Sequence, residues 1–342
     1  MFAMAWNPLK IPSTHLSIPP QYRALRWITL LLTAGIAAVL PGCQREAVEE
    51  SGEFAYVRGD SVEFRNELGP ASEVMGHLQS GERVHVVSRR PRWAEVRNAA
   101  GETGWVLQRY LVSHEIYDQF EQLARQVEAL PSQGAAVIRR EANLHLQPGR
   151  DTQVFYQLAD GERAEVVGHR VAPRNPAPVE ASPEAAAAGR AEGSASNDED
   201  WLLVRASDGR SGWLLEGAAD LNPPIEVAQY REGLRIRAWF EIYRELDQGE
   251  ERAWYLWATI RRVAGLPHDF DEIRVFVWNP RASRYETAYR ERNLTGFYPI
   301  VAGSSESPGG ASPRFRLQLE DSSGQRFEKS YFMGGRQVRV ER

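Results

Sequence analysis

Cys43 has the most distinctive chemistry in this sequence, because it is the only cysteine among 342 residues. It follows Leu-Pro-Gly (40–42) at the end of an uncharged apolar run, Trp27–Leu40, and two arginines stand before that run. A basic flank, a short apolar stretch and small residues at a cleavage point are typical of a secretory signal peptide. The run has 14 residues, fewer than the roughly 20 that a membrane-spanning helix needs. We therefore expect residues 1–42 to be a signal peptide.

The tetrapeptide Leu40-Pro41-Gly42-Cys43 resembles the lipobox of bacterial lipoproteins. In that family the cysteine thiol receives a diacylglyceryl group, cleavage occurs just before the cysteine, and the new amino terminus is acylated. The resemblance implies that lipidated Cys43 anchors the chain to a membrane of the cell envelope, where it faces the periplasm or the exterior. More than one acyl chain is needed for stable attachment. An ordinary signal peptide, or an uncleaved anchor with a chance cysteine, is the alternative.

Gln44 follows the predicted lipidation site, where an aspartate would stand in lipoproteins kept at the inner membrane of some Gram-negative bacteria. By that analogy, the outer membrane is favoured if the source is Gram-negative. From Cys43 onward the chain has 38 basic and 46 acidic side chains, a net charge of −8. Because an acidic chain repels phosphate backbones, we expect no nucleic-acid partner.

Groups for catalysis are not clustered in the sequence. If Cys43 is acylated, no thiol remains for a nucleophile, a disulfide or a thiolate metal site. The seven histidines are scattered and never form His-x-x-x-His, and neither a Gly-x-Ser-x-Gly elbow nor a phosphate loop occurs. We therefore predict a protein that is not an enzyme and that uses no metal or cofactor. A glycosidase with two carboxylates stays open as an alternative.

One pattern occurs twice in the chain. Each copy contains three segments in the same order. They are a leucine shortly before Gly-Glu, then Trp-x-x-Val-Arg, then Gly-x-x-Gly-Trp. Their marker residues are Leu78, Trp93 and Trp105 in the first copy and Leu158, Trp201 and Trp213 in the second. The second copy contains an insertion between its leucine and its first tryptophan. The insertion lies within residues 169–199, which are rich in Pro, Ala, Gly, Ser and acidic residues. We expect this insertion to be a disordered surface loop, because it cannot bury enough apolar area to order itself.

Alternating valines and Gly-Glu turns in each copy predict short strands. Gly104-Trp105 and Gly212-Trp213 each place a large aromatic directly after a residue without Cβ. This step suits a tightly curved barrel in which the strand bends and the indole enters the core. Trp105 and Trp213 are therefore predicted core residues.

The repeated pattern resembles the bacterial SH3-like domain, whose closing Tyr-Leu is present as Tyr110-Leu111 and absent from the second copy. The resemblance implies two small barrels that bind peptidoglycan peptides or an envelope protein, or that serve only as packing modules. A shallow groove between loops would suit a short extended peptide. The candidate groove residues are Phe64, Arg65, Trp93 and Tyr110 in the first copy and Trp201 and Arg205 in the second.

Residues 114–130 are predicted to form an amphipathic helix between the copies. The apolar positions recur every three or four residues, as one helix face requires, at Ile116, Phe120, Leu123, Val127 and Leu130. Ser113 is the expected N-cap and Pro131 the expected stop. Docking against a barrel is the expected role, with a short coiled-coil contact as the alternative.

The sequence as a whole predicts a mostly β protein: two small SH3-like barrels joined by a short helix, followed by an all-β sandwich or barrel of about eight strands. The expected organisation is a signal peptide (1–42), a linker (43–53), a first SH3-like domain (54–112), a helical linker (113–135), a second SH3-like domain (136–221) and a C-terminal domain (222–342).

The function that fits best is a non-catalytic envelope lipoprotein whose tandem SH3-like domains bind peptidoglycan peptides or an envelope protein. One alternative is a scaffold lipoprotein whose C-terminal domain binds the partner while the SH3-like domains only pack. A cryptic cell-wall hydrolase is the other.

Overall fold

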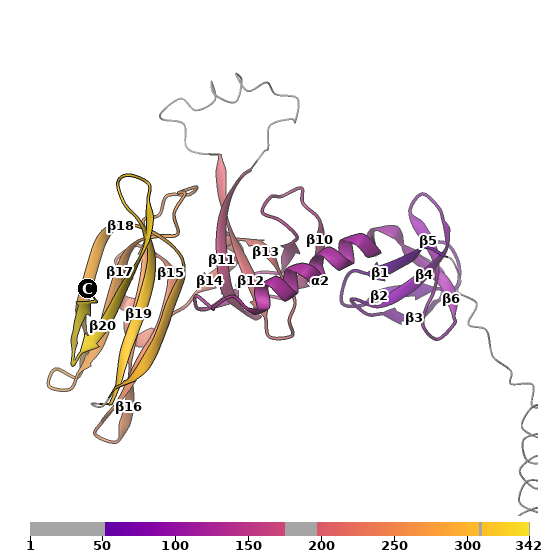
Figure 1. Cartoon of the computed structure of the whole chain (residues 1–342). Coiled ribbons are helices and arrows are strands. Elements are labelled where there is room, and N and C mark those ends of the chain that lie inside the picture. Colours follow the sequence, from indigo (N-terminus) through magenta and orange to yellow (C-terminus); the bar gives the residue numbers. More distant parts are fainter. Residues whose placement is uncertain (1–51, 175–196, 308–309, 342) are drawn as a thin grey trace, which may run out of the picture. The chain divides into compact units, whose positions relative to one another are not determined.

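The computed structural model describes residues 52–174, 197–307 and 310–341. Cys43 and the predicted signal peptide lie outside this part of the chain. The described residues form three antiparallel sheets of seven strands each, and Figure 1 shows them with one long helix. The mostly β fold class is confirmed. No helix within the described residues has the length and apolar character needed to cross a membrane.

The first sheet has the strand order β3-β2-β6-β5-β4-β1-β7. Its strands are β1 (Phe54–Val57), β2 (Val62–Arg65), β3 (Val74–Leu78), β4 (Arg83–Arg89), β5 (Trp93–Arg97), β6 (Thr103–Leu107) and β7 (Leu111–Ser113), with the short helix η2 (Gln108–Tyr110) before β7. Alternate residues of each strand point to one side, where Phe64, Leu78 and Val106 belong to a single apolar core.

The second sheet repeats this order as β10-β9-β13-β12-β11-β8-β14. Its elements are β8 (Ala135–Ile138), β9 (Ala142–His145), β10 (Val154–Leu158), β11 (Arg163–Pro173), β12 (Asp198–Ala206), β13 (Ser211–Leu215), η3 (Glu216–Ala218) and β14 (Ala219–Leu221). The same pairing recurs at the marker residues, because Glu95 pairs with Trp105 and Leu203 pairs with Trp213. Positions in the two sheets can therefore be compared one by one.

The predicted loop 169–199 is shorter in the structure than the sequence indicated. Strand β11 continues to Pro173, which pairs with Asp198 at the start of β12. The two strands thus extend as a hairpin beyond the small sheet. Composition could not reveal this extension, because its side chains are ordered by contacts with a distant part of the chain, described below. Residues 175–196 lie outside the described residues.

Gly104 and Gly212 occupy points where a neighbouring strand comes close. A Cβ on Gly104 would lie 2.7 Å from both the Phe64 ring and the Arg65 carbonyl oxygen, and one on Gly212 would lie 2.8 Å from Leu144 Cβ. The glycine therefore admits a side chain of the facing strand into the core. Since successive strand residues point to opposite sides, the next residue, Trp105, points outward and is only half-buried. Its predicted place in the core was wrong.

Helix α2 (His114–Glu128) confirms the predicted helix but ends two residues earlier than expected. Ser113 is at the N-cap, although its side chain makes no capping hydrogen bond. Tyr117 stacks on Tyr56 of β1, with ring centroids 3.8 Å apart, and meets the ring of Phe155 of β10 edge-on. The helix therefore packs against strands of both sheets and is not a free linker.

The third sheet is a meander in which sequence neighbours pair in order from β15 to β21. Short helices α4 (Ile225–Ala228) and η4 (Gln229–Arg231) precede β15 (Arg235–Asp247), β16 (Glu250–Ile260), β17 (Phe270–Asn279), β18 (Arg284–Ser307), β19 (Gly310–Glu320), β20 (Arg326–Gly334) and β21 (Gln337–Val340). We expected about eight strands, but this sheet has seven. One reason is that Arg284–Ser307 form the single long strand β18, whose pairing with β19 shifts register between Phe297 and Val301.

One apolar cluster joins the second sheet to the third. Its buried members include Leu202 and Val204 of β12 and Trp257 of β16. The fully buried side chain of Gln133 reinforces the joint: its Nε2 donates to the carbonyl oxygen of Ile300 (3.3 Å), and its Oε1 accepts from the Ile300 N–H (2.9 Å). A buried amide with both ends bonded favours one packing arrangement over others.

Candidate functional site

The outward side of the first sheet carries a set of apolar and aromatic side chains around one carboxylate. We call Met75, Val87, Trp93, Glu95 and Trp105 the open face. Alternation in β5 and β6 buries their neighbours Ala94, Val96 and Val106 completely and turns these residues outward. Met75 is 47% exposed and Val87 is 42% exposed, whereas the two tryptophans are half-buried. Exposed apolar and aromatic groups gathered on one side of a sheet are typical of a binding surface.

The predicted groove residues of the first copy do not lie on one surface in the structure. Trp93 lies on the open face. Phe64 is 1% exposed and belongs to the core, because Gly104 opposite it leaves room for the ring. Tyr110 is half-buried against the same core and lies beneath the Arg109 guanidinium, which is 4.8 Å from the ring centroid. Phe64 was therefore wrongly assigned to the groove.

Arg65 points outward beside Trp105, its partner in the strand register. Its guanidinium donates to the Ser72 carbonyl oxygen and to the Glu63 carboxylate. The side chain is 11% exposed. Arg65 therefore ties β2 to the loop before β3, and its charge is already balanced rather than offered to a ligand.

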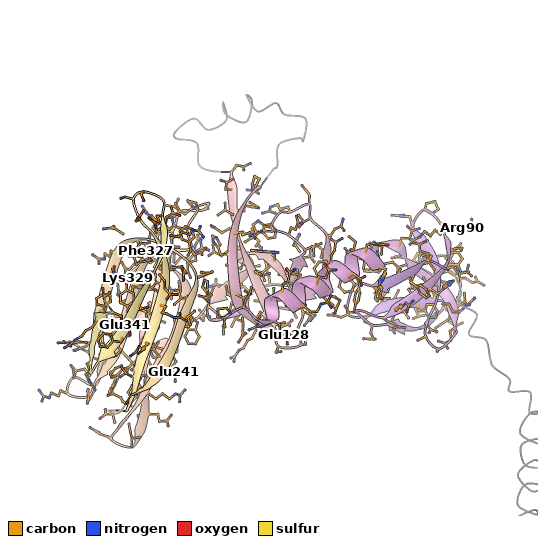
Figure 2. All side chains as sticks on the ribbon, viewed as in Figure 1. Arg90, Glu128, Glu241, Phe327, Lys329 and Glu341 are labelled. Atoms are coloured by element: carbon orange, nitrogen blue, oxygen red, sulfur yellow. The ribbon has the colours of Figure 1, made fainter. Side chains whose placement is uncertain are left out.

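The groove residues predicted for the second copy have structural roles instead. Trp201 is 2% exposed and packs with Val127 of α2. Arg205 donates to the carbonyl oxygens of Val127 (2.9 Å) and Glu128 (2.7 Å), and it also pairs with Glu165. These carbonyls lie at the helix C-terminus, where a cation is favourable. Figure 2 labels Glu128 at this end of the helix.

The outward side of the second sheet is thus covered by α2. Its buried residues Val167, Trp201, Leu203 and Trp213 form one cluster with helix residues Val127 and Leu123. They are the equivalents of Val87, Trp93, Glu95 and Trp105. The sequence contained a signal for this, namely the apolar stripe of the helix, but periodicity does not say which sheet a stripe covers.

A second polar cluster lies where the β11–β12 hairpin meets the third sheet, and sequence reasoning missed it. His169 Nδ1 is 2.7 Å from Asp269 Oδ1, and its Nε2 is 3.0 Å from Asp200 Oδ1. The histidine side chain is 2% exposed. Since both ring nitrogens face carboxylates, a doubly protonated ring can donate to both of them, and this arrangement favours the imidazolium. The sequence separation of 100 residues between His169 and Asp269 gives no local signal.

Charges around the imidazolium are balanced. Arg237 is fully buried, 3.2 Å from Asp200 Oδ1 and 2.8 Å from Glu216 Oε1. Burial lowers the pKa of His169, but hydrogen bonds from the ring to both aspartates outweigh burial and raise it above its ordinary value. For Asp200, burial raises the pKa, but the hydrogen bond from His169 and the charge of Arg237 outweigh burial and lower the pKa to about 2.

This cluster contains a histidine oriented by a carboxylate, which is one part of a catalytic arrangement. A histidine that acts as a general base needs one nitrogen on an orienting carboxylate and the other free to take a proton from a nucleophile. Here Asp200 holds the second nitrogen of His169. The geometry therefore suits a buried electrostatic joint. No group of three His, Cys, Asp or Glu side chains within the described ranges is placed to hold a metal ion.

Comparison with protein families matches residues 60–112 to the bacterial SH3 domain family. This segment, which contains the whole open face, is a bacterial SH3 domain. Among curated proteins, the comparison found no match.

The solved structures that match this chain include two from Trichomonas vaginalis. NlpC1 is 12% identical with a TM-score of 0.18, and the match covers 52% of this chain and 48% of NlpC1. NlpC2 is 9% identical with a TM-score of 0.17, and the match covers 85% of this chain and 99% of NlpC2. Scores this low carry no argument about fold or activity.

Proposed function

We propose that this chain is a non-catalytic, lipid-anchored protein of the cell envelope that binds a peptide ligand through the open face of its bacterial SH3 domain. The ligand is a peptidoglycan peptide or a segment of an envelope protein. Trp93 and Trp105 are the expected anchors, because large aromatic side chains dominate binding at such surfaces. The family match at residues 60–112 supports a cell-wall or envelope ligand.

One observation carries the proposal: equivalent positions are covered in one sheet and uncovered in the other. Val167 is 5% exposed beneath α2, whereas Val87 is 42% exposed. We infer that the second sheet is a second SH3-like domain, supported by its identical strand order. It acts as a packing module between α2 and the third sheet, and the first domain acts as the binding module.

A pull-down with purified cell-wall sacculi tests the proposal. The full-length protein is compared with Trp93→Ala and Trp105→Ala, and Arg90→Ala is the matched control at the exposed β4–β5 turn (Figure 2). We expect the tryptophan variants to lose retention and the control to keep it. If sacculi retain none of the proteins, photo-crosslinking from position 87 in cells must capture an envelope protein. Absence of both results would reject the proposal.

The anchor is tested separately. We propose that Cys43 carries the lipid and is the first residue of the mature chain, supported by the lipobox resemblance. Cys43→Ser is expected to leave an unprocessed protein without lipid label, measured by metabolic labelling with a fatty acid and by the size of the product. A Cys43→Ser protein of mature size that still sediments with membranes would remove the anchor from the proposal.

Zymography on a cell-wall substrate tests the non-catalytic part of the proposal. Purified full-length protein is expected to leave the substrate intact. Clearing of the substrate would favour the hydrolase alternative.

A further inference from the structure

The second sheet shows what kind of element the outward side of this fold accepts. There an amphipathic helix lies across the sheet, with Phe120 and Val127 fully or almost fully buried. The ring centroid of Phe120 is 5.8 Å from that of Phe155 on β10, and Val127 packs with Trp201 and Trp213 on the central strands. One helix face thus spans from an outer strand to the middle of the sheet.

The open face of the first sheet has the same extent. Met75 on β3 is 47% exposed, while its equivalent on β10, Phe155, is fully buried under α2. At the other end of the footprint, Val87 is exposed and its equivalent Val167 is buried. The uncovered residues of the first sheet therefore match the whole footprint of a helix, rather than a single pocket for one side chain.

One position differs in chemistry between the two faces. Leu203 lies in the apolar cluster beneath α2, and its equivalent in the first sheet is Glu95. The Glu95 carboxylate accepts a hydrogen bond from Ser88 Oγ (2.9 Å). On its side of the sheet it lies between Trp93 and Arg97 of β5 and opposite Trp105 of β6. A purely apolar helix would remove water from this carboxylate without supplying a charge of its own, which is costly. A helix with a cation at that point would form an ion pair instead.

We propose that the open face binds an amphipathic helix of a partner protein, with an apolar stripe and one lysine or arginine placed against Glu95. This inference rests on the proposed function and specifies its ligand as a protein helix rather than a peptidoglycan peptide. The α2 helix of a second copy is a poor occupant, because its apolar stripe is already buried against its own sheet. Partner choice by one buried charge is a common source of specificity.

The test uses labelled synthetic peptides and the full-length protein. One peptide has the sequence of residues 114–128, and two others carry lysine in place of Leu123 or of Val127, the two helix residues that pack in the cluster containing Leu203. Fluorescence anisotropy measures their binding to wild type, Trp93→Ala, Glu95→Leu and the Arg90→Ala control. We expect one lysine peptide to bind wild type about tenfold or more tightly than the unmodified peptide.

Glu95→Leu makes the open face resemble the second sheet and should reverse this order of preference. Trp93→Ala should weaken all peptides about tenfold or more, and Arg90→Ala should change none of them. Glu95→Leu is an outward substitution, so it keeps the test valid if Trp93→Ala fails to fold. Raising the salt concentration should weaken the lysine peptide more than the unmodified one.

Several outcomes would overturn the inference. If sacculi retain the protein in a Trp93-dependent way while no peptide binds, the open face binds the cell wall. The proposed function then stands and the helix inference fails. If peptides bind with the same order to wild type and Glu95→Leu, the charge rule is wrong. A dimer of full-length protein that Trp93→Ala abolishes would make a second copy the occupant. If neither sacculi nor peptides respond to Trp93→Ala, both proposals fail.

Discussion

Gly104 has no side chain, and this allows β2 to approach β6 closely in the first sheet. A Cβ there would lie 2.7 Å from the Arg65 carbonyl oxygen and from the Phe64 ring, and backbone cannot move aside easily. We expect Gly104→Ala to lower the free energy of unfolding by about 1–3 kcal/mol through overpacking. Urea unfolding of the full-length protein measures this. Gly76→Ala on β3 is the matched control, since a Cβ there meets nothing within 4 Å. Equal effects of the two changes would contradict the close approach.

The same glycine separates the roles of two aromatic residues. Phe64→Ala removes a buried ring and should cost about 3–5 kcal/mol. Trp105→Ala removes a half-buried outward side chain and should cost clearly less, even though the side chain is larger. Thermal unfolding of both variants compares them. A Trp105→Ala protein as unstable as Phe64→Ala would place the indole in the core after all.

These residues show why the sequence alone placed strands well and side chains less well. Alternating valines identified β4 and β11, and the repeated Gly-Trp step correctly marked a crowded point. Which of the two neighbours enters the core depends on Phe64, which belongs to another strand. Local pattern cannot contain that information, so the prediction exchanged the places of Phe64 and Trp105.

Helix α2 is the element that makes the two small sheets different. Its C-terminal carbonyls accept hydrogen bonds from Arg205 of β12. We expect Arg205→Ala to lower stability by about 1–2 kcal/mol, since hydrogen bonds from charged donors contribute about 1.5–3 kcal/mol and this side chain is partly exposed. Hydrogen exchange should show faster exchange in the last turn of α2. Unchanged protection there would mean that apolar packing of Val127 alone holds the helix end.

The helix and the hairpin mark the limit of prediction at the element scale. Spacing predicted an amphipathic helix over 114–130, but it could not say that the stripe covers the second copy and leaves the first open. Composition assigned 169–199 to a loop, although His169 and Val171 belong to β11. Both details depend on partners far away in sequence, and Asp269 is the example for the hairpin.

At the scale of the whole molecule, the buried cluster around His169 holds the second sheet against the third. It collects ionisable groups from every element that meets there. They are His169 of β11, Asp200 of β12, Glu216 of η3, Arg235 and Arg237 of β15, His268 and Asp269 before β17 and Tyr298 of β18. Apolar contacts alone would make this joint insensitive to pH, whereas the imidazolium makes it sensitive.

The sign of the effect follows from the pKa values. The pKa of His169 is raised in the folded protein, so its contribution is fully present below the ordinary histidine value of about 6.5 and is lost as pH rises through the folded value. The pKa of Asp200 falls to about 2, so its contribution is present above pH of about 4 and is lost as the solution is acidified towards that value. The contributions of His169 and Asp200 are therefore both present between about pH 4 and about pH 6.5. Burial lowers the pKa of His268 beside Asp269, so this residue opposes folding as the pH falls below about 6.5.

We expect the free energy of unfolding of the full-length protein to decrease as the pH rises above about 6.5, because the unfolded chain loses the His169 proton first. Urea unfolding at a series of pH values measures this slope. His169→Gln should flatten it, and the exposed His77→Gln on β3 should leave it unchanged. Hydrogen exchange at residues 169–173 adds a local readout, with faster exchange at alkaline pH in wild type. A slope that survives in His169→Gln would show that other groups control the joint.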